Sequence, residues 1–414
     1  MATTPFYPRF IEPKLSDALA DTPIVLIHGP RQCGKTTLAQ RYGAGHGYEY
    51  FSFDDPVVAA AAEADPVGFI GDLPARTILD EVQRVPEVFT ALKAIVDRDR
   101  APGRFILTGS ANALFVPRLA DSLAGRMEIL RLHPLAQCEL VGARSGFLDH
   151  LLNGSFPSGN HERLGRDLLA CITAGGYPVA LARLSSSRRA AWYRNYVETF
   201  IQRDVRDLAR IRSLDALPRL LALVAAQTAQ LLNASALASP FQLSRPTIRD
   251  YVTLLERIFL LDILPPWHSN RLSRLVKTPK VHVGDSGIAC SLLGLDVEGL
   301  ARDREILGHL LETFVFQELR RHASWHGEDL RFFHFRDRDK DEVDIVLERG
   351  AHGVAGVEVK AGATIRDEDF RGLRKLQRAT GTRFTAGVVL YDGETRAPFG
   401  DRLFAVPIRT LWEP

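Results

Sequence analysis

The hydrophobic and polar positions in the first third of the chain alternate between short apolar runs and segments with helical spacing. Short apolar or alternating runs are typical of strands, and the longer segments between them are typical of helices. The predicted strands cover residues 24–27, 48–53, 77–81, 104–108 and 127–132. Strands that alternate with helices in this way predict a parallel α/β sheet.

The pattern changes after this region. Residues 147–160 are polar and rich in turn-forming residues, so they predict a link, whereas residues 164–230 have helical spacing. From residue 308 an amphipathic helix precedes several strand-like runs, which predict a second α/β domain. These runs cover residues 330–335, 342–347, 354–360, 388–390 and 404–408. The predicted domains are residues 1–145, 160–230, 231–285 and 300–414.

The first predicted strand leads into a loop bounded by glycines. The run from Ile24 to Thr37 reads I-V-L-I-H-G-P-R-Q-C-G-K-T-T, which has the spacing of a phosphate-binding loop between a strand and a helix. Lys35 can reach the β- and γ-phosphates of a nucleoside triphosphate, and the Thr36 hydroxyl can ligate Mg²⁺. The residues predicted to bind the nucleotide here are Gly29, Pro30, Arg31, Gln32, Cys33, Gly34, Lys35, Thr36 and Thr37.

Two carboxylates end the third predicted strand. Asp80 and Glu81 follow Lys35 by about 45 residues, as in the Walker B pattern that accompanies a phosphate-binding loop. Asp80 is predicted to hold Mg²⁺, directly or through water, and Glu81 to polarise the attacking water.

Polar residues also follow the fourth predicted strand. Ser110, with Thr108 as the alternative, can sense the γ-phosphate from the tip of that strand. Arg126 comes soon after and is a candidate transition-state arginine, acting in its own subunit or in a neighbour. The alternative for Arg126 is a surface arginine that pairs with a carboxylate.

The motifs G-P-R-Q-C-G-K-T-T, L-D-E, L-T-G-S and L-A-G-R occur in this order and resemble those of AAA+ ATPases. The closer match is the bacterial and archaeal branch that carries a C-terminal domain of unknown function. This resemblance covers nearly the whole chain and implies ATP as the nucleotide, a helical lid and a homo-oligomer, with a ring if Arg126 acts in trans. The run 175–178, G-G-Y-P, resembles an element that some relatives carry in the lid, and a simple helix break fits it equally well.

Residues 231–285 have a helix–turn–helix rhythm. A short helix at 234–238 and a turn precede a helix at 246–259 that Ser244 caps, which resembles a winged helix whose second helix enters a DNA groove. Between Leu231 and Lys280 there are seven Arg/Lys and three Asp/Glu, a local excess that favours a DNA-facing surface. A winged helix used only for packing or protein contact is the alternative. The predicted DNA contacts are Arg245, Thr247, Arg249, Arg271, Arg274, Lys277 and Lys280.

The last predicted domain contains a set of charged residues on apolar elements. Glu312 lies in the amphipathic helix, and Glu358 and Lys360 share one face of a strand because they are two residues apart. With Asp344 on the preceding strand, they resemble the site of PD-(D/E)xK nucleases, a superfamily that includes Holliday-junction resolvases. The proline that stands before the first carboxylate in the family motif is absent here: Val343 precedes Asp344.

The nuclease resemblance implies a restriction-endonuclease-like α/β domain. Asp344 and Glu358 would bind Mg²⁺, and Lys360 would orient or deprotonate the attacking water, with Glu312 as a further catalytic residue. The E-x-K spacing alone is a weak signal, since surface strands often alternate Glu and Lys. A domain of this fold can also bind without cleaving.

The composition is that of a globular protein, with 46% hydrophobic and 25% charged residues and a net charge of +2. This even balance means that any basic surface must be local. The four cysteines are scattered, without metal or redox spacing, which is typical of a reduced, cytoplasmic protein. No run is long enough to span a membrane, and residues 1–10 lack the apolar core of a signal peptide. A cytoplasmic protein without a membrane partner is therefore predicted.

Two functions fit these patterns. The first is an ATPase that acts on double-stranded or branched DNA, with or without Mg²⁺-dependent cleavage. The second is a nucleotide-switched signalling or scaffolding ATPase whose C-terminal domain binds a partner without cleaving it. DNA-stimulated ATP turnover would favour the first function, and turnover indifferent to DNA would favour the second.

Overall fold

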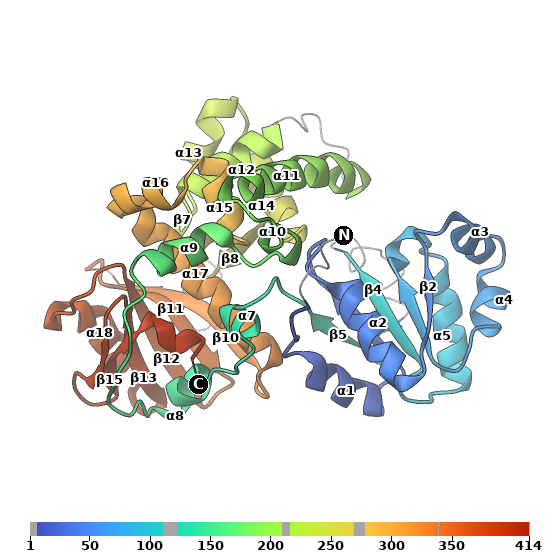
Figure 1. The fold of residues 1–414 in the computed structure, drawn as a ribbon, viewed down its shortest axis with the longest axis horizontal. Coiled ribbons are helices and arrows are strands. Elements are labelled where there is room, and N and C mark those ends of the chain that lie inside the picture. The colour runs from blue at the N-terminus through green and yellow to red at the C-terminus, as the bar shows by residue number, and fades with distance from the viewer. Residues whose placement is uncertain (1–5, 111–122, 209–215, 269–277, 338, 414) are drawn as a thin grey trace. The chain divides into compact units, whose positions relative to one another are not determined.

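The computed structural model describes residues 6–110, 123–208, 216–268, 278–337 and 339–413 (Figure 1). They form two compact units. The N-terminal unit contains residues 8–135 and 257–259, and the C-terminal unit contains residues 136–256 and 260–414 with the first seven residues of the chain.

The N-terminal unit contains a sheet of five parallel strands in the order β2-β3-β4-β1-β5. This confirms the parallel α/β sheet that the alternation of apolar runs predicts. The strands are β1 (Ile24–His28), β2 (Glu49–Ser52), β3 (Thr77–Asp80), β4 (Phe105–Gly109) and β5 (Met127–Arg131). The helices are α1 (Glu12–Asp21), α2 (Lys35–His46), α3 (Pro56–Ala64), α4 (Pro66–Gly71), η1 (Val82–Arg84) and α5 (Val88–Arg98).

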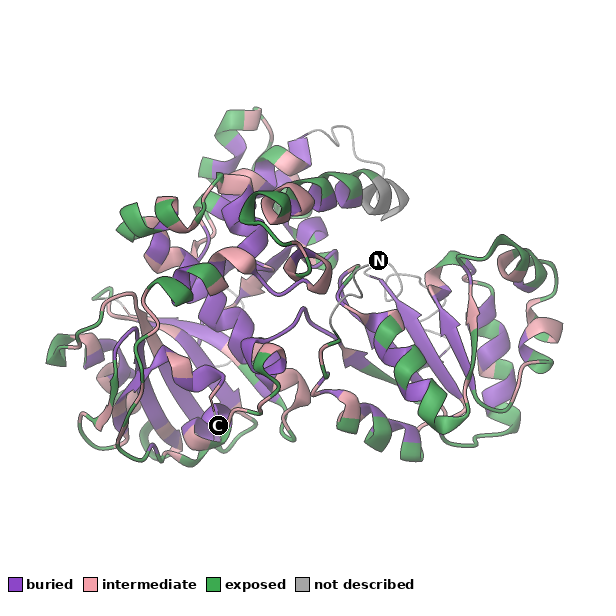
Figure 2. Ribbon diagram, in the orientation of Figure 1, coloured by how far each residue is buried: buried purple, intermediate pink, exposed green. Residues whose placement is uncertain are grey.

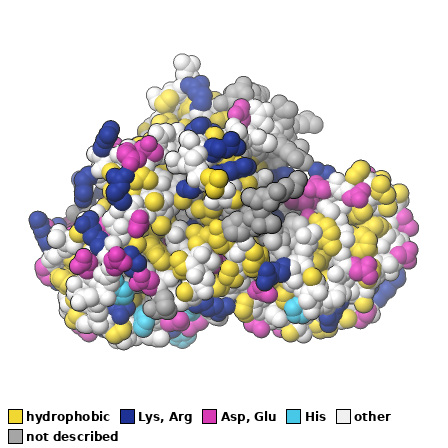
Figure 3. Space-filling model, viewed as in Figure 1, with side chains coloured by type: hydrophobic (Ala, Val, Ile, Leu, Met, Phe, Trp, Pro, Cys, Tyr) yellow, Lys and Arg dark blue, Asp and Glu magenta, His cyan; other side chains and the backbone are white. Residues whose placement is uncertain are grey.

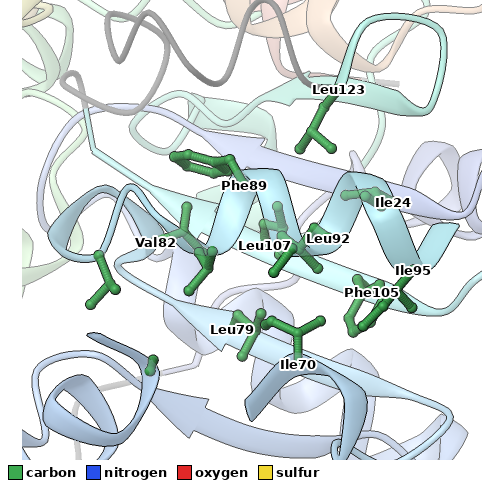
Figure 4. Close-up of a cluster of buried hydrophobic side chains, with 14 of the residues drawn as sticks. Ile24, Ile70, Leu79, Val82, Phe89, Leu92, Ile95, Phe105, Leu107 and Leu123 are labelled. Carbon is green, nitrogen blue, oxygen red and sulfur yellow. The ribbon is translucent and has the colours of Figure 1, made fainter. Parts of the chain in front are cut away.

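One hydrophobic cluster fixes α5 against the sheet (Figure 4). The α5 side chains of Phe89 and Leu92 pack with Leu79 of β3 and Leu107 of β4, and all four side chains are fully buried. Burial of each such side chain is worth about 1.5–3 kcal/mol relative to exposure. The cluster therefore holds the ends of β3 and β4 in fixed register, which places the polar residues that follow these strands.

A seven-stranded mixed sheet forms the core of the C-terminal unit, in the order β10-β11-β12-β13-β15-β14-β6. Its strands β11, β12, β13 and β15 are mostly buried, whereas β14 and β6 at one edge are not (Figure 2). They are β6 (Gly159–Asn160), β10 (Leu330–Arg336), β11 (Glu342–Arg349), β12 (Gly353–Lys360), β13 (Phe384–Tyr391), β14 (Thr395–Pro398) and β15 (Leu403–Pro407). The helices packed with this sheet include α8 (Phe147–Asn153), α17 (Arg304–Trp325) and α18 (Arg371–Thr380). A further helix, α7 (Gln137–Val141), is bonded to α17 through the backbone N–H of Gln137 and the carboxylate of Glu318.

The prediction of a turn-rich link at residues 147–160 is wrong. Its first half is α8, which buries Phe147, Leu148, Leu151 and Leu152, and its last two residues are β6, which pairs with β14. The helix is only seven residues long, so its apolar spacing is too short to stand out from the polar residues that follow.

Helices and a small sheet make up the rest of the C-terminal unit, as the helical spacing from residue 164 predicts. The helices are α9 (Arg166–Ala174), α10 (Pro178–Leu181), α11 (Ser186–Leu208), α12 (Ala216–Ala226), α13 (Ala234–Ala238), α14 (Arg245–Arg257), α15 (Ser286–Leu293) and α16 (Val297–Arg302). A three-stranded sheet in the order β7-β9-β8 accompanies them. Its strands are β7 (Gln230–Leu231), β8 (Leu261–Leu264) and β9 (Lys280–Val283).

A buried ion network joins these helices to α17. The guanidinium of Arg321 donates to Asp285 at 3.0 Å and to Glu318 at 2.7 Å, and Asp285 also accepts from the backbone N–H of Gly176 at 2.8 Å. Gly175 has φ +66°, and a Cβ there would lie 2.1 Å from the Asp285 carboxylate. The run 175–178 is therefore a helix break between α9 and α10 that is bonded to Asp285.

Charged side chains of both signs are interspersed over the face in view in Figure 3, in keeping with the net charge of +2. Within the described ranges, every helix is too short or too polar to cross a bilayer.

Candidate functional site

The glycine-bounded loop of the N-terminal unit joins β1 to α2. Lys35, at the start of α2, is buried, and its Nζ donates to the carbonyls of Gly29 at 3.0 Å and Pro30 at 2.9 Å. Gly34 has φ +104°, which favours glycine, and a Cβ on Gly29 would lie 2.1 Å from the carbonyl oxygen of Leu132. Both glycines are thus required by the shape of the loop, and Lys35 lies folded over it.

The side chains of Arg9 and Cys33 stabilise this loop through hydrogen bonds to backbone carbonyls. Arg9 donates to the carbonyl of Cys33 at 2.8 Å and to that of His133 at 2.6 Å. The Cys33 thiol is buried, donates to the carbonyl of Leu132 at 3.5 Å and has a raised pKa because of its burial. Cys33 is therefore a protonated residue that packs behind the loop. Arg9 stabilises the loop through these hydrogen bonds, a role that no sequence motif around Arg9 indicates.

Asp80 lies at the end of β3 and is surrounded by hydroxyl groups. It accepts from Thr36 at 3.0 and 3.2 Å, from Tyr50 at 2.8 Å and from Thr108. Asp80 is buried, and each of these donors is uncharged. A carboxylate with nearby hydroxyl oxygens is a donor set that suits Mg²⁺, so Thr36 and Asp80 fit the metal predicted for them.

Glu81 has φ +57°, a left-handed conformation that is uncommon for a non-glycine residue. Its backbone N–H donates to Thr108 at 3.2 Å, and its carboxylate accepts from the side chain of Gln83. The same Gln83 amide donates to Ser110 at 3.1 Å. The two residues predicted to act on water and on the γ-phosphate are thus linked by Gln83, which belongs to none of the predicted motifs.

Arg126 makes a two-pronged ion pair with Asp97 of α5, at 2.6 and 2.9 Å. Its pKa is raised because of this hydrogen bonding to Asp97. In this structure Arg126 therefore matches the alternative of a surface arginine that pairs with a carboxylate. The remaining predicted loop residues differ in exposure: Arg31 is half-buried, and Gln32 and Thr37 are exposed.

A second acidic site lies in the C-terminal unit, between α17, β9 and β11. Lys280 of β9 is 4% exposed, and its Nζ lies 2.8 Å from Glu312 and 3.2 Å from Asp344. Glu342 is a third carboxylate, at 3.9 Å. Burial opposes the charge of Lys280, but Glu312 and Asp344 outweigh it and raise the pKa of Lys280, so the ammonium stays protonated.

Glu358 and Lys360 lie on β12, next to β11. Ile345 pairs with Val357, and one further step in this register puts Asp344 opposite Glu358. Lys360 Nζ lies 2.9 Å from Glu358, while the other Glu358 oxygen is buried without a hydrogen-bond partner among the described residues. Burial and the charge of Asp344 raise the pKa of Glu358 to about 8.

The nuclease-like residues are therefore neighbours. Burial and Asp344 also raise the pKa of Glu312 well above its usual value, and the ammonium of Lys280 opposes this rise. A hollow of ≈ 560 Å³ opens on the cluster. Its polar and charged lining includes Lys280, Glu312, Glu342, Asp344, Arg336 and His309.

A divalent ion does not fit this second site as it stands. The position between Glu312 and Asp344, where a cation would neutralise both carboxylates, holds the ammonium of Lys280. In the described parts of the chain, no three His, Cys, Asp or Glu side chains are grouped so that they could hold a metal ion.

The predicted DNA contacts are found in different places. Arg245 and Arg249 are exposed on α14, and Thr247 is half-buried, with its N–H bonded to Ser244 at 3.2 Å. Arg271, Arg274 and Lys277 lie outside the described residues. Lys280, expected on a basic surface, is instead buried in the carboxylate cluster.

Three family models match consecutive parts of the chain. Residues 21–141 match the AAA domain model. Residues 165–299 match a Domain of unknown function (DUF8612), and residues 307–411 match a Domain of unknown function (DUF4143). The first match covers the phosphate-binding loop, Asp80 and Ser110, so it supports a P-loop AAA+ ATPase. The other two matches assign no activity.

Solved structures of low similarity include the Walker-type ATPase PABY2304 of Pyrococcus abyssi, with 16% identity, a TM-score of 0.42 and coverage of 68% of this chain and 94% of that chain. The RuvB Holliday junction branch migration motor of Thermotoga maritima has 19% identity, a TM-score of 0.29 and coverage of 62% and 89%. TM-scores of this size do not establish a shared overall fold.

Two sequence relatives match over nearly the full chain. They are the uncharacterized proteins Rv2008c of Mycobacterium tuberculosis and Mb2031c of Mycobacterium bovis. Each is 30% identical over 395 residues, which cover 95% of this chain and 82% of the relative. The chain therefore belongs to the family of these two mycobacterial proteins, and its residues 21–141 form a P-loop AAA+ ATPase domain.

Proposed function

We propose that the protein is a Mg²⁺-dependent ATPase that acts on DNA. The observation that carries the ATPase part is the gathering of Lys35, Thr36 and Asp80 at the carboxyl ends of β1 and β3. Open parallel sheets bind their ligands at this edge. Lys35 lies over the carbonyls of Gly29 and Pro30, so it can turn from them to an incoming phosphate.

The roles of the other residues follow from their contacts. Thr36 and Asp80 would hold Mg²⁺, which neutralises charge on the phosphates when it is bound. Glu81 would position the attacking water, and Gln83 would hold Glu81 and Ser110 in fixed relation to each other. Tyr50 and Thr108 would orient Asp80.

ATP binding and turnover, measured separately, test these roles. Glu81→Gln should bind ATP as the wild type does and lose turnover, because only the water-positioning carboxylate is removed. Lys35→Ala should lose both binding and turnover. Full turnover in Glu81→Gln would remove Glu81 from the mechanism and transfer its role to another residue of the site.

DNA binding is proposed for residues 231–285. Two helices, α13 and α14, precede the strand pair β8 and β9, an order that suits a winged helix. The second helix exposes Arg245 and Arg249 one turn apart, and arginines so placed can contact phosphates along a groove.

Binding of labelled duplex and four-way-junction DNA tests this surface. A variant with both Arg245→Ala and Arg249→Ala should bind more weakly, and the salt dependence of its affinity should fall by about one unit of slope per arginine. Arg188→Ala, an exposed arginine of α11, is the matched control. Unchanged DNA binding in the double variant would assign this surface to packing or protein contact.

A nucleotide-switched scaffold is the function from a different class. In that function ATP controls assembly with a protein partner, and the C-terminal unit binds without cleaving. ATP turnover with and without DNA separates the two proposals, because only the first predicts stimulation. Turnover that ignores DNA would support the scaffold.

Mg²⁺-dependent DNA cleavage is a further candidate for the C-terminal unit. The nearness of Asp344, Glu358 and Lys360 supports it, whereas the ammonium of Lys280 between two of the carboxylates opposes it. If the domain cleaves plasmid or junction DNA, Lys360→Ala should abolish cleavage. Cleavage that survives Lys360→Ala would exclude the proposed site.

A homo-oligomer is proposed from the AAA+ class, with a ring if Arg126 acts on a neighbouring subunit. The ion pair between Arg126 and Asp97 within one subunit does not favour that role. Sedimentation with and without ATP, combined with turnover of Arg126→Ala, tests both statements. A fully active monomer would exclude the ring.

A further inference from the structure

The carboxylate cluster of the C-terminal unit is assembled from two parts of the chain that the sequence separates. Glu312 of α17 and Asp344 of β11 belong to the nuclease-like region, whereas Lys280 belongs to the small sheet that precedes it. Lys280 lies 32 residues before Glu312 and 64 residues before Asp344. The small sheet therefore supplies a positive charge to a site that is otherwise acidic.

Lys280 is held in this place by its backbone. It pairs with Leu231 of β7 on one side and with Leu264 of β8 on the other, so its strand is the central one of the sheet. His282, two residues along on the same face, bonds to Thr313 of α17 at 3.1 Å. The backbone of Lys280 is thus held by strand pairing on both sides, which fixes the position from which its ammonium reaches the carboxylates.

Other charged groups around the cluster have partners of their own. Arg336 lies 3.0 Å from Glu342, and Lys360 lies 2.9 Å from Glu358. His282, whose Nε2 lies 3.9 Å from Glu312, is neutral because burial and Lys280 lower its pKa well below the usual value. Among the residues that the structure describes, Lys280 is therefore the cation that Glu312 and Asp344 share.

A hollow of ≈ 560 Å³ is lined by Lys280, Glu312, Glu342 and Asp344. Because ions can reach these side chains through the hollow, the charges of the cluster, rather than access to it, determine which ion binds. A divalent ion that entered this hollow would meet carboxylates that already contact an ammonium, and like charges would repel at contact distance.

We propose that Lys280 occupies the cation position of the Glu312–Asp344 site, so that this site takes no divalent ion while β9 stays in its sheet. Removal of the Lys280 charge converts the same carboxylates into a site for a hard divalent cation, which prefers oxygen ligands. The proposal concerns the C-terminal unit alone and does not depend on ATP hydrolysis or DNA binding.

Titration of the full chain with Mn²⁺, followed by the paramagnetic resonance of the free ion, tests the proposal. All variants carry Asp80→Asn, which weakens the other predicted metal site, and no nucleotide is present. The parent should show no Mn²⁺ binding that depends on Glu312. Lys280→Met, which keeps the length of the side chain without its charge, should bind one Mn²⁺ per chain.

Two controls make the result specific. Adding Glu312→Gln to Lys280→Met should remove the new Mn²⁺ site, and Lys360→Met, which leaves Lys280 in place, should create none. A folded Lys280→Met chain without Mn²⁺ binding would overturn the proposal.

The parent chain provides a measurement that needs no folded Lys280 variant. If the parent binds Mn²⁺ and Glu312→Gln abolishes that binding, Lys280 does not fill the cation position and the proposal is wrong. If Mn²⁺ raises the midpoint of thermal unfolding of Lys280→Met but not that of the parent, the proposal is supported even where the variant is too unstable for titration.

Discussion

The two acidic sites of this protein are both built on carboxylates and differ in what those carboxylates contact. Asp80 of the N-terminal unit accepts hydrogen bonds from the hydroxyls of Thr36, Tyr50 and Thr108. Glu312 and Asp344 of the C-terminal unit share the ammonium of Lys280.

We expect this difference to decide how readily each site accepts a cation. A hydroxyl can rotate and offer its oxygen to a metal without leaving a charge behind. An ammonium has no lone pair to offer, and its displacement leaves a buried charge without a partner. Carboxylates at the right spacing therefore do not identify a metal site until their partners are known.

The largest effect is expected at the ammonium. Lys280→Met should destabilise the C-terminal unit by about 3–5 kcal/mol, because it leaves buried carboxylates without their cation. All four tryptophans lie in this unit, so denaturant unfolding followed by tryptophan fluorescence reports on it alone.

Lys375 is the matched comparison for this variant. It also contacts three carboxylates, those of Asp337, Asp339 and Asp341, but at the surface, where water can replace it. Lys375→Met should therefore cause a much smaller loss of stability than Lys280→Met. Equal losses in the two variants would show that burial does not distinguish the two lysines.

The next effect is expected at the hydroxyl-bound site. Lys35→Ala should lower ATP turnover by a factor on the order of 10²–10³, since it removes the cation that we propose to bind the phosphates. Lys93→Ala on α5 is the control and should turn over ATP at the wild-type rate. If Lys35→Ala kept its ATP turnover, Lys35 and the phosphate-binding loop would not take part in catalysis.

A smaller effect is expected from acid. Burial and the neighbouring Arg321 lower the pKa of His322 to about 3, whereas an unfolded chain protonates histidine near pH 6.5. The unfolded state thus binds more protons below pH 6.5, and stability falls as the pH falls. From pH 7 to pH 5 this loss is roughly 2 kcal/mol.

His322→Gln should flatten this acid dependence, and His352→Gln, at an exposed histidine, should not. The readout is the denaturant midpoint of tryptophan fluorescence as a function of pH. An unchanged slope in His322→Gln would place the acid sensitivity at the other buried histidines, His282 and His334, whose pKa values are also lowered by burial.

The smallest effect is expected at Tyr50. Tyr50→Phe removes one of three hydroxyls from Asp80, which is worth about 1 kcal/mol, or about fivefold in turnover. Tyr48→Phe is the control, because Tyr48 bonds to the carbonyl of Gly103 and not to Asp80. A loss of a hundredfold or more in Tyr50→Phe would mean that the tyrosine contacts the reacting groups directly.

The phosphate-binding loop and the parallel sheet could be predicted from the sequence because their signals are local. A strand, two glycines, Lys35 and Thr36 lie within a short run, and the loop geometry requires those residue types. Apolar runs likewise predict β1, β3 and β4, which are buried along their whole length, whereas β2 contains no buried residue and β5 buries only Leu130.

The partners of Lys280, Arg126 and Arg9 could not be predicted, because they lie at distant positions in the sequence. Nothing around Lys280 indicates Glu312 or Asp344, so its basic surroundings favoured a DNA surface instead. Arg126 lies 29 residues from Asp97, and Arg9 lies 124 residues from His133. Residue types and spacing predict which groups can do chemistry, whereas tertiary packing determines which of them are already paired.

The join between the ends of the C-terminal unit has a consequence for biosynthesis. Ser145 donates a hydrogen bond to the carbonyl of Thr410, which is 265 residues away, and β6 completes the sheet beside β14. On the ribosome, the five strands of the N-terminal sheet emerge together, whereas α8 and β6 emerge long before their partner strands exist. The apolar side chains of α8 therefore stay exposed until translation is nearly complete. We therefore expect the C-terminal unit, rather than the N-terminal unit, to need chaperones during synthesis.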